Sequence, residues 1–371
     1  MRIAIDGLPL YNPLTGIGHY TLELARHLAL VNPEDQVSLV SPRRFVKAAR
    51  NTKEANLKFA RRFSPLMDFW WKSSLPRYLR KNRFDLYHGT NYEFPLKADC
   101  PIVVTIHDLS VLFHANTHEN KRVVDTQAIL REAAKRVARI ITPTEAIRRE
   151  VHEQLSVALD RIVAIPEAAK ACFYPDASQA ALRARNRLRV GDKFVLYVGT
   201  VEPRKNLLTL VKAFEQTVAS LGDSSLQLVI AGRKGWLIQD LFAYVKGSPI
   251  AKQVKFTGYL TDDELRALYS GCNLFVYPSL YEGFGLPPLE AMSCGAPVIA
   301  SRIPSITEVV GDAAELIAPT DVEGLADLMG RLLPNEAVRR AMSVKGIERA
   351  SQLSWKRTAE MTRAVYVGVM R

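Results

Sequence analysis

The chain has 371 residues and a formal net charge of +12, with 50 Lys and Arg residues against 38 Asp and Glu residues. Hydrophobic residues make up 48% and charged residues 24%, a balance typical of folded globular proteins that excludes a disordered or low-complexity chain. The length exceeds what one hydrophobic core ordinarily organises, so we expect two domains. No apolar run reaches the roughly 18 to 20 residues of a membrane-spanning helix, and the N-terminus is typical of a strand, not of a signal peptide. These features predict a cytoplasmic protein.

Short aliphatic and β-branched runs alternate with helical periodicity, which is typical of a doubly wound parallel sheet in an α/β protein. The strands expected in the first half are Arg2–Asp6, Gln36–Val40, Leu57–Ala60, Asp85–His88, Ile102–Ile106, Arg139–Thr142 and Arg161–Ile165. The alternation of expected strands and helices stops between Pro166 and Pro175. A charged amphipathic segment, Ala177–Val190, then leads into a new strand. We therefore expect a first domain over residues 1–170.

The second half repeats the alternation of strands and helices. Its expected strands are Phe194–Val198, Leu226–Ala231, Val254–Thr257, Leu274–Tyr277, Pro297–Ala300 and Ala314–Ile317. The terminal segment Trp355–Met370 has apolar residues at near-helical spacing, which predicts an amphipathic helix packed on a domain surface. We expect a second domain over residues 171–354 and a terminal helix over residues 355–371 that returns towards the first domain.

Basic residues concentrate between Arg43 and Arg83, where two acids, Glu54 and Asp68, are outnumbered. The basic residues there are Arg43, Arg44, Lys47, Arg50, Lys53, Lys58, Arg61, Arg62, Lys72, Arg77, Arg80, Lys81 and Arg83. Aromatic residues are interleaved with them in helical sequence that we expect to break at Pro65 and Pro76. Three interpretations stay open: contact with an anionic membrane or a lipid-linked acceptor, a solvated face over a core-packing stripe, and, less favoured, nucleic-acid binding.

Ligands of parallel sheets bind beyond the carboxyl ends of the strands, so motifs that follow strands matter most. The segment Ser279–Glu290 follows one such strand end. Gly283 and Gly285 allow a turn whose amides can approach an anion, and the helix that follows would present its N-terminus to a phosphate. Glu282 and Glu290 flank this turn, where their carboxylates suit the hydroxyl groups of a sugar.

This stretch resembles the retaining glycosyltransferases of family 4, whose GT-B architecture consists of two Rossmann-like domains that face a cleft. The resemblance rests on the Glu282-x7-Glu290 pair and on the trailing Cys294-Gly295-x-Pro297-Val298. It implies that Glu290 holds the ribose of a nucleotide sugar and that Glu282 holds the transferred hexose. The diphosphate would be bound by the amides of Gly283, Phe284, Gly285 and Leu286.

The loop Gly199–Asn206 carries a second motif directly after the strand Phe194–Val198. Arg204 and Lys205 on this loop would place two cations where a departing diphosphate accumulates negative charge. The family has an Arg and a Lys here for the phosphates, so the resemblance makes both residues catalytic and adds Gly199 to the donor site. Asn206 departs from the glycine that the family often has next.

Two motifs of the first domain complete the expected site. A lone histidine such as His107 is more often structural, but the family has a histidine at this strand end that faces the donor hexose. The resemblance makes His107 catalytic, with its backbone carbonyl placed to stabilise positive charge at the anomeric carbon. The loop Thr15–Tyr20 corresponds to the family's glycine-rich loop, where Gly16 would approach the phosphates. It is no dinucleotide fingerprint, because Thr21 stands where a glycine is required, and this disfavours an oxidoreductase.

Weaker signals also follow strands. The turns Gly232–Gly235 and Gly258–Leu260 lie where the family contacts the nucleobase through backbone groups, so we include Tyr259 among the donor-binding residues. The alternative for either turn is plain turn chemistry without a ligand. His88 and Asn91 also lie at a strand end and are candidates for contact with the acceptor, with no preference over a structural role.

The predicted reaction moves a hexose from a nucleotide diphosphate sugar to a hydroxyl group with retention of configuration. In a front-face mechanism the leaving diphosphate deprotonates the acceptor. Similarity to bacterial mannosyltransferases of surface-polysaccharide (O-antigen) assembly suggests GDP-mannose as donor and a glycan or lipid-linked oligosaccharide as acceptor. The alternatives are a transferase that uses UDP-glucose or UDP-N-acetylglucosamine and, in another class, a sugar-nucleotide epimerase. We expect no cofactor and no metal, because cationic side chains neutralise the diphosphate and the four cysteines lack metal-ligand spacing.

Overall fold

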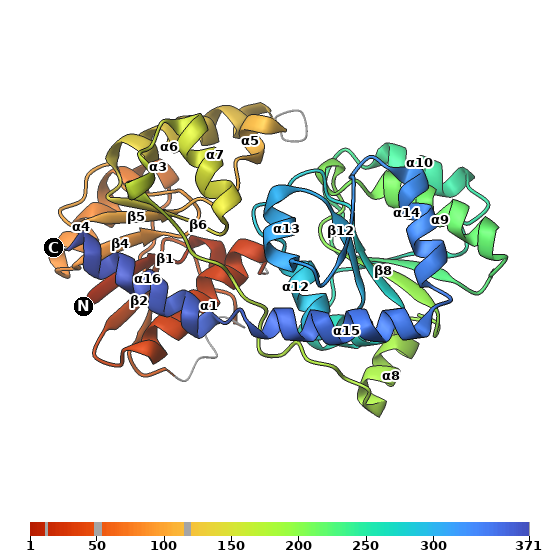
Figure 1. Cartoon of the computed structure of the whole chain (residues 1–371). Coiled ribbons are helices and arrows are strands. Elements are labelled where there is room, and N and C mark those ends of the chain that lie inside the picture. The colour runs from red at the N-terminus through yellow and green to blue at the C-terminus, as the bar shows by residue number, and fades with distance from the viewer. Residues whose placement is uncertain (12–13, 48–53, 115–119, 371) are drawn as a thin grey trace. The chain divides into compact units, whose positions relative to one another are not determined.

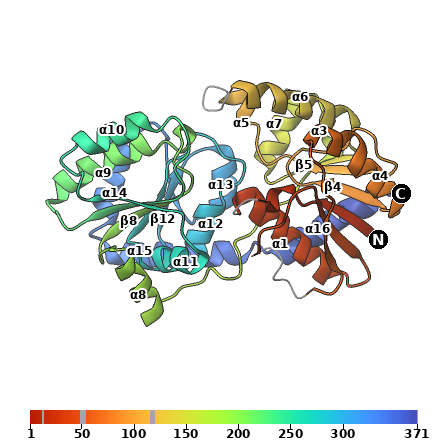
Figure 2. The ribbon, with the colours of Figure 1, turned by 180° about the vertical axis from the view of Figure 1, so that it is seen from behind.

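The computed structural model describes residues 1–11, 14–47, 54–114 and 120–370. The chain divides into two compact units, one formed by Met1–Glu167 with Ser354–Arg371 and one by Ala168–Leu353. We call these unit 1 and unit 2. In each unit a parallel sheet is covered by helices on both faces, as two opposite views show (Figures 1 and 2).

Unit 1 contains a seven-stranded sheet of order β3-β2-β1-β4-β5-β6-β7, in which all pairs are parallel. Its strands are β1 (Arg2–Asp6), β2 (Gln36–Ser41), β3 (Leu57–Arg61), β4 (Leu86–Gly89), β5 (Ile102–Thr105), β6 (Arg139–Thr142) and β7 (Ile162–Ala164). The central strand β1 is buried because its residues are apolar on both faces, as Ile3, Ala4 and Ile5 show. Each strand expected from the sequence is present.

Unit 2 contains a six-stranded parallel sheet of order β10-β9-β8-β11-β12-β13. Its strands are β8 (Phe194–Val198), β9 (Gln227–Ala231), β10 (Val254–Gly258), β11 (Leu274–Tyr277), β12 (Val298–Ser301) and β13 (Glu315–Ile317). In both sheets the order reverses direction beside the first strand of the unit, which is the doubly wound topology. The fold class expected from the sequence is confirmed in both units.

The helices of unit 1 include α1, which lies with α16 on one side of the sheet, while α6 and α7 lie on the other (Figure 1). Their bounds are α1 (Gly16–Val31), α3 (Met67–Phe69), α4 (Leu75–Lys81), α5 (Ser110–Phe113), α6 (Asn120–Arg136), α7 (Glu145–Leu155) and α16 (Trp355–Val369). Short 3-10 turns cover Leu8–Leu10 and Leu159–Arg161. Helix α7 begins where the Thr144 side chain accepts a hydrogen bond from the Ile147 amide, at 3.2 Å.

In unit 2, α14 packs on α9 at one face of the sheet, and α15 packs on α12 at the other. The helices are α8 (Gln179–Arg187), α9 (Leu207–Leu221), α10 (Gln239–Gly247), α11 (Asp262–Gly271), α12 (Leu286–Ser293), α13 (Pro304–Val310), α14 (Val322–Leu332) and α15 (Glu336–Ser351). A 3-10 turn covers Pro203–Lys205. Helix α11 begins with a capping box, in which Thr261 and Glu264 satisfy each other's backbone amides.

The expectation of a break at Pro76 is wrong. Helix α3, a π-type turn over Trp70–Ser74 and α4 follow one another without interruption, and Pro76 lies in the first turn of α4. The Leu75 amide donates to the Trp70 carbonyl, five residues earlier, so the turn is wider than an α-helical one. A widened turn leaves room for the proline ring, which would clash with the preceding turn of a regular helix.

The terminal helix α16 belongs to unit 1 through buried polar contacts. A hydrogen bond of 2.6 Å joins the Tyr366 hydroxyl to Nδ1 of His88, and His88 Nε2 lies 2.8 Å from Thr105 Oγ1. Arg363 donates to Asp35 at 2.7 Å, and the hydroxyl of Thr358 donates to a backbone carbonyl, at the same distance. Burial, together with the charge of His107, lowers the pKa of His88 to about 3, so this ring is neutral.

We expect Tyr366→Phe to lower the free energy of unfolding by about 1 to 3 kcal/mol, because it leaves a buried nitrogen of His88 without its partner. Urea denaturation followed by circular dichroism measures the change. Tyr11→Phe is the matched control, since the Tyr11 ring is 47% exposed in the same unit. Equal stability of the two variants would show that the Tyr366 hydroxyl does not hold α16 in place.

Candidate functional site

Two loops of unit 2 form a charged cluster at the carboxyl edge of its sheet. The loop after β8 carries Arg204 and Lys205, and the loop after β11 carries Glu282. Because β8 and β11 are neighbours in the sheet, their loops emerge side by side. The Leu280 amide donates to the Arg204 carbonyl at 2.9 Å, which fixes one loop against the other.

Glu282 is the centre of this cluster. Its Oε1 accepts hydrogen bonds from Lys205 Nζ at 2.5 Å and from the Tyr277 hydroxyl at 2.8 Å, and its Oε2 accepts from Arg204 Nη1 at 3.1 Å. Arg204 also donates to Glu202, at 2.9 Å. The structure therefore brings together three of the predicted site residues as ion pairs.

The side chains of Glu282 and Lys205 are both buried, and burial alone would raise the pKa of the carboxyl group. The charges of Lys205 and Arg204 outweigh burial and hold the pKa of Glu282 at about 2. Burial and the neighbouring Arg204 lower the pKa of Lys205, while Glu282 opposes them. Glu282 is therefore a carboxylate at neutral pH and can only accept hydrogen bonds, as a ligand for hydroxyl groups must.

The turn before α12 has the geometry expected of an anion site. Gly285 has a φ of 95°, and a Cβ placed there would lie 2.4 Å from Ile306. A side chain is excluded at this position, so the amides at the N-terminus of α12 are not covered by one. The Ser305 hydroxyl donates to the backbone carbonyl of Glu282 at 2.5 Å and anchors the start of the turn.

Glu290 lies on α12, in surroundings different from those of Glu282. The Tyr269 hydroxyl donates to its Oε2 at 3.1 Å. Burial raises the pKa of Glu290 to about 7, against the opposing effects of the Lys170 charge and the Tyr269 hydrogen bond. Lys170 itself forms an ion pair with Asp262. The two glutamates of the motif are thus held by separate sets of partners.

Tyr259 follows β10 at the same edge of the sheet and is 54% exposed. The Arg233 guanidinium lies 4.7 Å from the centre of its ring. The Gly232 amide donates to the Gly258 carbonyl at 2.9 Å, which aligns the two turns. A Cβ at Gly232 would lie 1.9 Å from the carbonyl oxygen of Gly199, so this turn requires glycine.

In unit 1, His107 follows β5 and is fixed on three sides. Its Nδ1 lies 3.1 Å from Glu167 Oε1, and its Nε2 lies 2.9 Å from the Thr90 carbonyl oxygen. Its ring contacts the Tyr20 ring edge to face, with the centroids 4.6 Å apart. Gly16 is the first residue of α1, and open space lies beside its Cα.

Sequence reasoning missed the residues that hold the predicted ones. Tyr277 and Glu202 are the partners of the unit 2 cations, Tyr269 and Lys170 are the partners of Glu290, and Glu167 is the partner of His107. A usable signal existed for two of them, since Tyr277 ends a strand and Glu202 lies inside the Gly199–Asn206 motif. Glu167 lies 60 residues from His107, and no local pattern links them.

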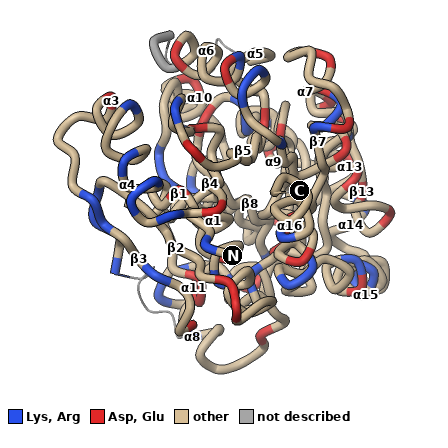
Figure 3. Tube along the Cα trace, turned by 90° about the vertical axis from the view of Figure 1, so that its left-hand side faces the viewer, with Lys and Arg blue, Asp and Glu red and all other residues tan. Residues whose placement is uncertain are grey.

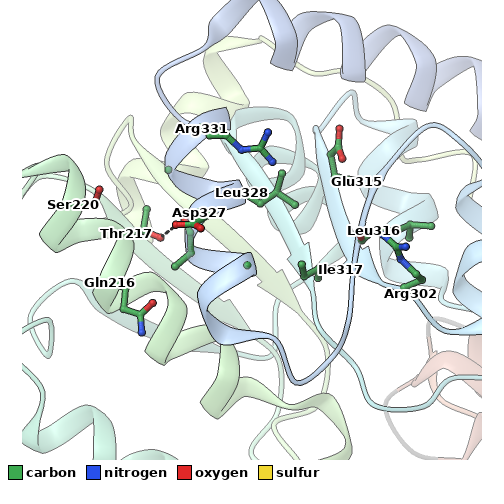
Figure 4. A pocket seen from close by; sticks show the side chains of 13 residues that line it. Gln216, Thr217, Ser220, Arg302, Glu315, Leu316, Ile317, Asp327, Leu328 and Arg331 are labelled. Carbon is green, nitrogen blue, oxygen red and sulfur yellow. Dashed lines mark hydrogen bonds between the residues drawn. The ribbon is translucent and has the colours of Figure 1, made fainter.

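A pocket of about 940 Å³ elsewhere in unit 2 contains none of these residues. It is lined by residues of α9, β13 and α14, among them Thr217, Glu315 and Arg331 (Figure 4). Within the described ranges, no three His, Cys, Asp or Glu side chains are arranged to hold a metal ion.

Comparison with known proteins decides the family. Residues 178–349 match the family described as glycosyl transferases group 1, and residues 14–169 match glycosyltransferase family 4. The chain is 32% identical over 99% of its length to O-antigen chain mannosyltransferase B of Escherichia coli, of which it covers 99%. The chain is a glycosyltransferase of the GT-B fold.

Other relatives of this glycosyltransferase agree. The serotype-specific mannosyltransferase WbdA of Escherichia coli is 33% identical over 61% of the chain, which covers 28% of that protein. Sucrose-phosphate synthase from Thermosynechococcus elongatus superposes with a TM-score of 0.80 at 22% identity, covering 99% of this chain and 98% of the other. WaaG, a glycosyltransferase involved in lipopolysaccharide biosynthesis, superposes with a TM-score of 0.78 at 15% identity, covering 99% of this chain and 100% of WaaG. These structures share the fold.

If Lys205 stabilises the leaving diphosphate as the family resemblance implies, we expect Lys205→Ala to lower the rate of sugar transfer by about 100-fold to 1000-fold, because that buried cation is lost. Glu290→Ala should abolish transfer as well, with the folded structure retained in both variants. Initial rates of product formation, with circular dichroism spectra of each variant, measure the effect. Lys193→Ala is the control, since that lysine is 62% exposed and pairs with Asp223. Wild-type rates in Lys205→Ala or Glu290→Ala would contradict the assignment of the site.

Proposed function

We propose that this glycosyltransferase moves mannose from GDP-mannose to a glycan or lipid-linked oligosaccharide, with retention of configuration, during surface-polysaccharide assembly. The observation that carries the proposal is the Glu282 carboxylate held between Lys205 and Arg204 at the carboxyl edge of the unit 2 sheet. The choice of mannose rests on the full-length Escherichia coli relative, which is a mannosyltransferase of the O-antigen chain. The same relative makes a transferase the better choice than an epimerase.

The cluster suits stabilisation of a leaving diphosphate. Arg204 stays charged at any physiological pH, and Glu282 and Glu202 keep both cations in fixed positions. A nucleoside diphosphate at the N-terminus of α12 would gain the amides of that turn and the two cations together. We propose that these cations replace a metal ion, so that transfer continues in the presence of a chelator.

Retention follows from a front-face reaction in this proposal. The departing diphosphate accepts the proton of the acceptor hydroxyl on the face where the new bond forms, and the bond to the diphosphate breaks as the bond to the acceptor oxygen forms. Glu282 is ionised and hydrogen-bonded to two cations, so it serves as a ligand for hexose hydroxyls and not as a general base. Glu290, which lies on α12, accepts hydrogen bonds from the ribose hydroxyl groups.

A panel of nucleotides tests the donor. We expect GDP and GDP-mannose to stabilise the protein against thermal unfolding, by roughly 2.7 kcal/mol at about 100 times the dissociation constant. Lys205→Ala, with one cation fewer, should show a smaller shift with GDP-mannose. Stabilisation by UDP-glucose or UDP-N-acetylglucosamine, and not by GDP-mannose, would support a sugar transferase but would contradict GDP-mannose as its donor. Absence of any shift would contradict nucleotide-sugar binding.

The proposal includes peripheral contact with an anionic membrane, at the inner face of the cytoplasmic membrane, through residues 43–83 of unit 1. In the described ranges, no helix is long and apolar enough to cross a bilayer. Figure 3 shows Lys and Arg gathered along β3 and α4. Arg50 and Lys53, two of the basic residues in this segment, lie outside the described residues.

The two sides of this segment differ. Trp70, Leu75 and Leu79 are buried, so the inner side packs into the core of unit 1. Phe63 and Leu66 are exposed to 68% and 66%. The Arg61 guanidinium lies 5.9 Å from the centre of the Phe63 ring. Further exposed cations of the segment are Arg62, Arg77 and Lys81, and no described carboxylate forms an ion pair with any of these four residues. Exposed rings among unpaired cations suit an anionic bilayer, because the rings enter the headgroup layer while the cations attract it.

Vesicle binding tests this contact. Reversal of two charges in Arg61→Glu/Arg62→Glu should weaken binding to phosphatidylglycerol vesicles by more than tenfold, since each basic residue near an anionic surface contributes about 1 kcal/mol. Flotation assays measure it, and added salt should weaken wild-type binding. Arg183→Glu/Arg187→Glu reverses the same number of exposed charges on α8 and should change little. Equal binding to phosphatidylcholine and phosphatidylglycerol, or binding of nucleic acid without vesicles, would contradict the contact.

A further inference from the structure

Both ring nitrogens of His107 lie within hydrogen-bonding distance of an oxygen, and both of these oxygens are acceptors. The Thr90 carbonyl oxygen lies 2.9 Å from Nε2, and a carbonyl has no proton to give. Glu167 Oε1 lies 3.1 Å from Nδ1. A neutral imidazole has one N–H, so it satisfies one such acceptor and leaves its other nitrogen facing the lone pairs of the second.

The ring and the carboxyl group are shielded from water, which makes a mismatch costly. Glu167 is 4% exposed, and the His107 side chain is 15% exposed. An imidazolium that donates from both nitrogens to a carbonyl and a carboxylate satisfies all the groups and balances the charge of Glu167. Burial by itself lowers the pKa of His107, but the hydrogen bond and the charge of Glu167 raise it above its ordinary value.

The other titratable groups near His107 favour the same state. Asp108, the next residue, raises the pKa of His107 through its charge, and its Oδ1 accepts from the Ser110 amide at 2.8 Å. His88, on β4, is neutral. Burial raises the pKa of Tyr20 above its usual value, so the ring that contacts His107 from α1 is uncharged.

We propose that Glu167 is a positioning residue that keeps His107, the residue of unit 1 that the family resemblance makes catalytic, as a doubly donating imidazolium bound to Thr90. This inference rests on the proposed function, a sugar transfer to which the family resemblance adds His107 as a catalytic residue. It deepens that function by removing His107 from the candidates for general base, because an imidazolium has no lone pair to accept a proton. The acceptor proton is thereby left to the departing diphosphate.

The three residues join three strand ends of unit 1. Thr90 follows β4, His107 follows β5 and Glu167 follows β7. The Thr90 hydroxyl accepts from Thr21 of α1 at 2.8 Å, which fixes the loop that carries the Thr90 carbonyl. Glu167 therefore acts on His107 from a strand end that is not adjacent to β5 in the sheet. Its removal should release the ring without removing the Thr90 contact.

The variant Glu167→Gln keeps the size of the side chain and removes its charge. Nuclear magnetic resonance of 15N-labelled histidine, in the full chain without substrate, should show the pKa of His107 falling below its wild-type value. Its control is Glu23→Gln, which neutralises the carboxylate beside His27 in the same unit and should leave the pKa of His107 unchanged. Glu167→Asp retains the charge and should keep the pKa of His107 nearer to the wild-type value.

Kinetics complete the test. In Glu167→Gln we expect kcat, measured at a pH between the His107 pKa values of the variant and the wild type, to fall by roughly 10-fold to 100-fold. It should recover as the pH is lowered below the pKa of the variant, where the imidazolium forms again, with a smaller change in KM for the donor. An unchanged pKa of His107 in Glu167→Gln, or a wild-type pH profile, would overturn the proposal. The histidine titration needs no substrate, so it tests the role of Glu167 independently of the donor. If the enzyme used none of the nucleotide sugars in the panel, that result would refute the proposed function and not the role of Glu167.

Discussion

Every strand pair in the two sheets is parallel, and this single direction determines where chemistry can occur. Loops that follow parallel strands emerge at one edge, so residues far apart in the sequence become neighbours there. In unit 2 this edge gathers Arg204, Lys205 and Glu282 from two loops, and in unit 1 it gathers Thr90, His107 and Glu167 from three. The backbone direction, more than any one contact, assembles both sets of charged residues.

The charged groups at these edges are buried, which a folded protein tolerates only when each charge has partners. Lys205 and Glu282 meet this condition through each other, through Arg204 and through the Tyr277 hydroxyl. In the transfer that we propose, such an arrangement is fixed before a substrate arrives, so little reorganisation is needed when charge develops. Burial disfavours whichever form of a group is charged. It therefore lowers the pKa of His88 in unit 1 and raises the pKa of Glu290 in unit 2.

The strands and the motif residues could be predicted from the sequence, because both are local. A buried parallel strand is a continuous apolar run, as in Phe194–Val198, and the Glu282 motif follows its strand within a few residues. The effect of Pro76 was missed because it depends on the widened turn directly before it, which the spacing of apolar residues does not reveal. Partners across the fold were also out of reach: Tyr277 lies 72 residues from Lys205, and nothing in either segment specifies the other.

Helix α16 gives the chain an unusual order of assembly. Unit 2 is continuous in sequence, whereas unit 1 consists of residues on either side of it, so that unit 2 is in topological terms an insertion into unit 1. Tyr366 and Arg363 bind partners on β4 and in the loop before β2, which are synthesised hundreds of residues earlier. Every residue of unit 2 is therefore synthesised before the last helix of the earlier unit. The first part of the chain to be made is the last to be finished.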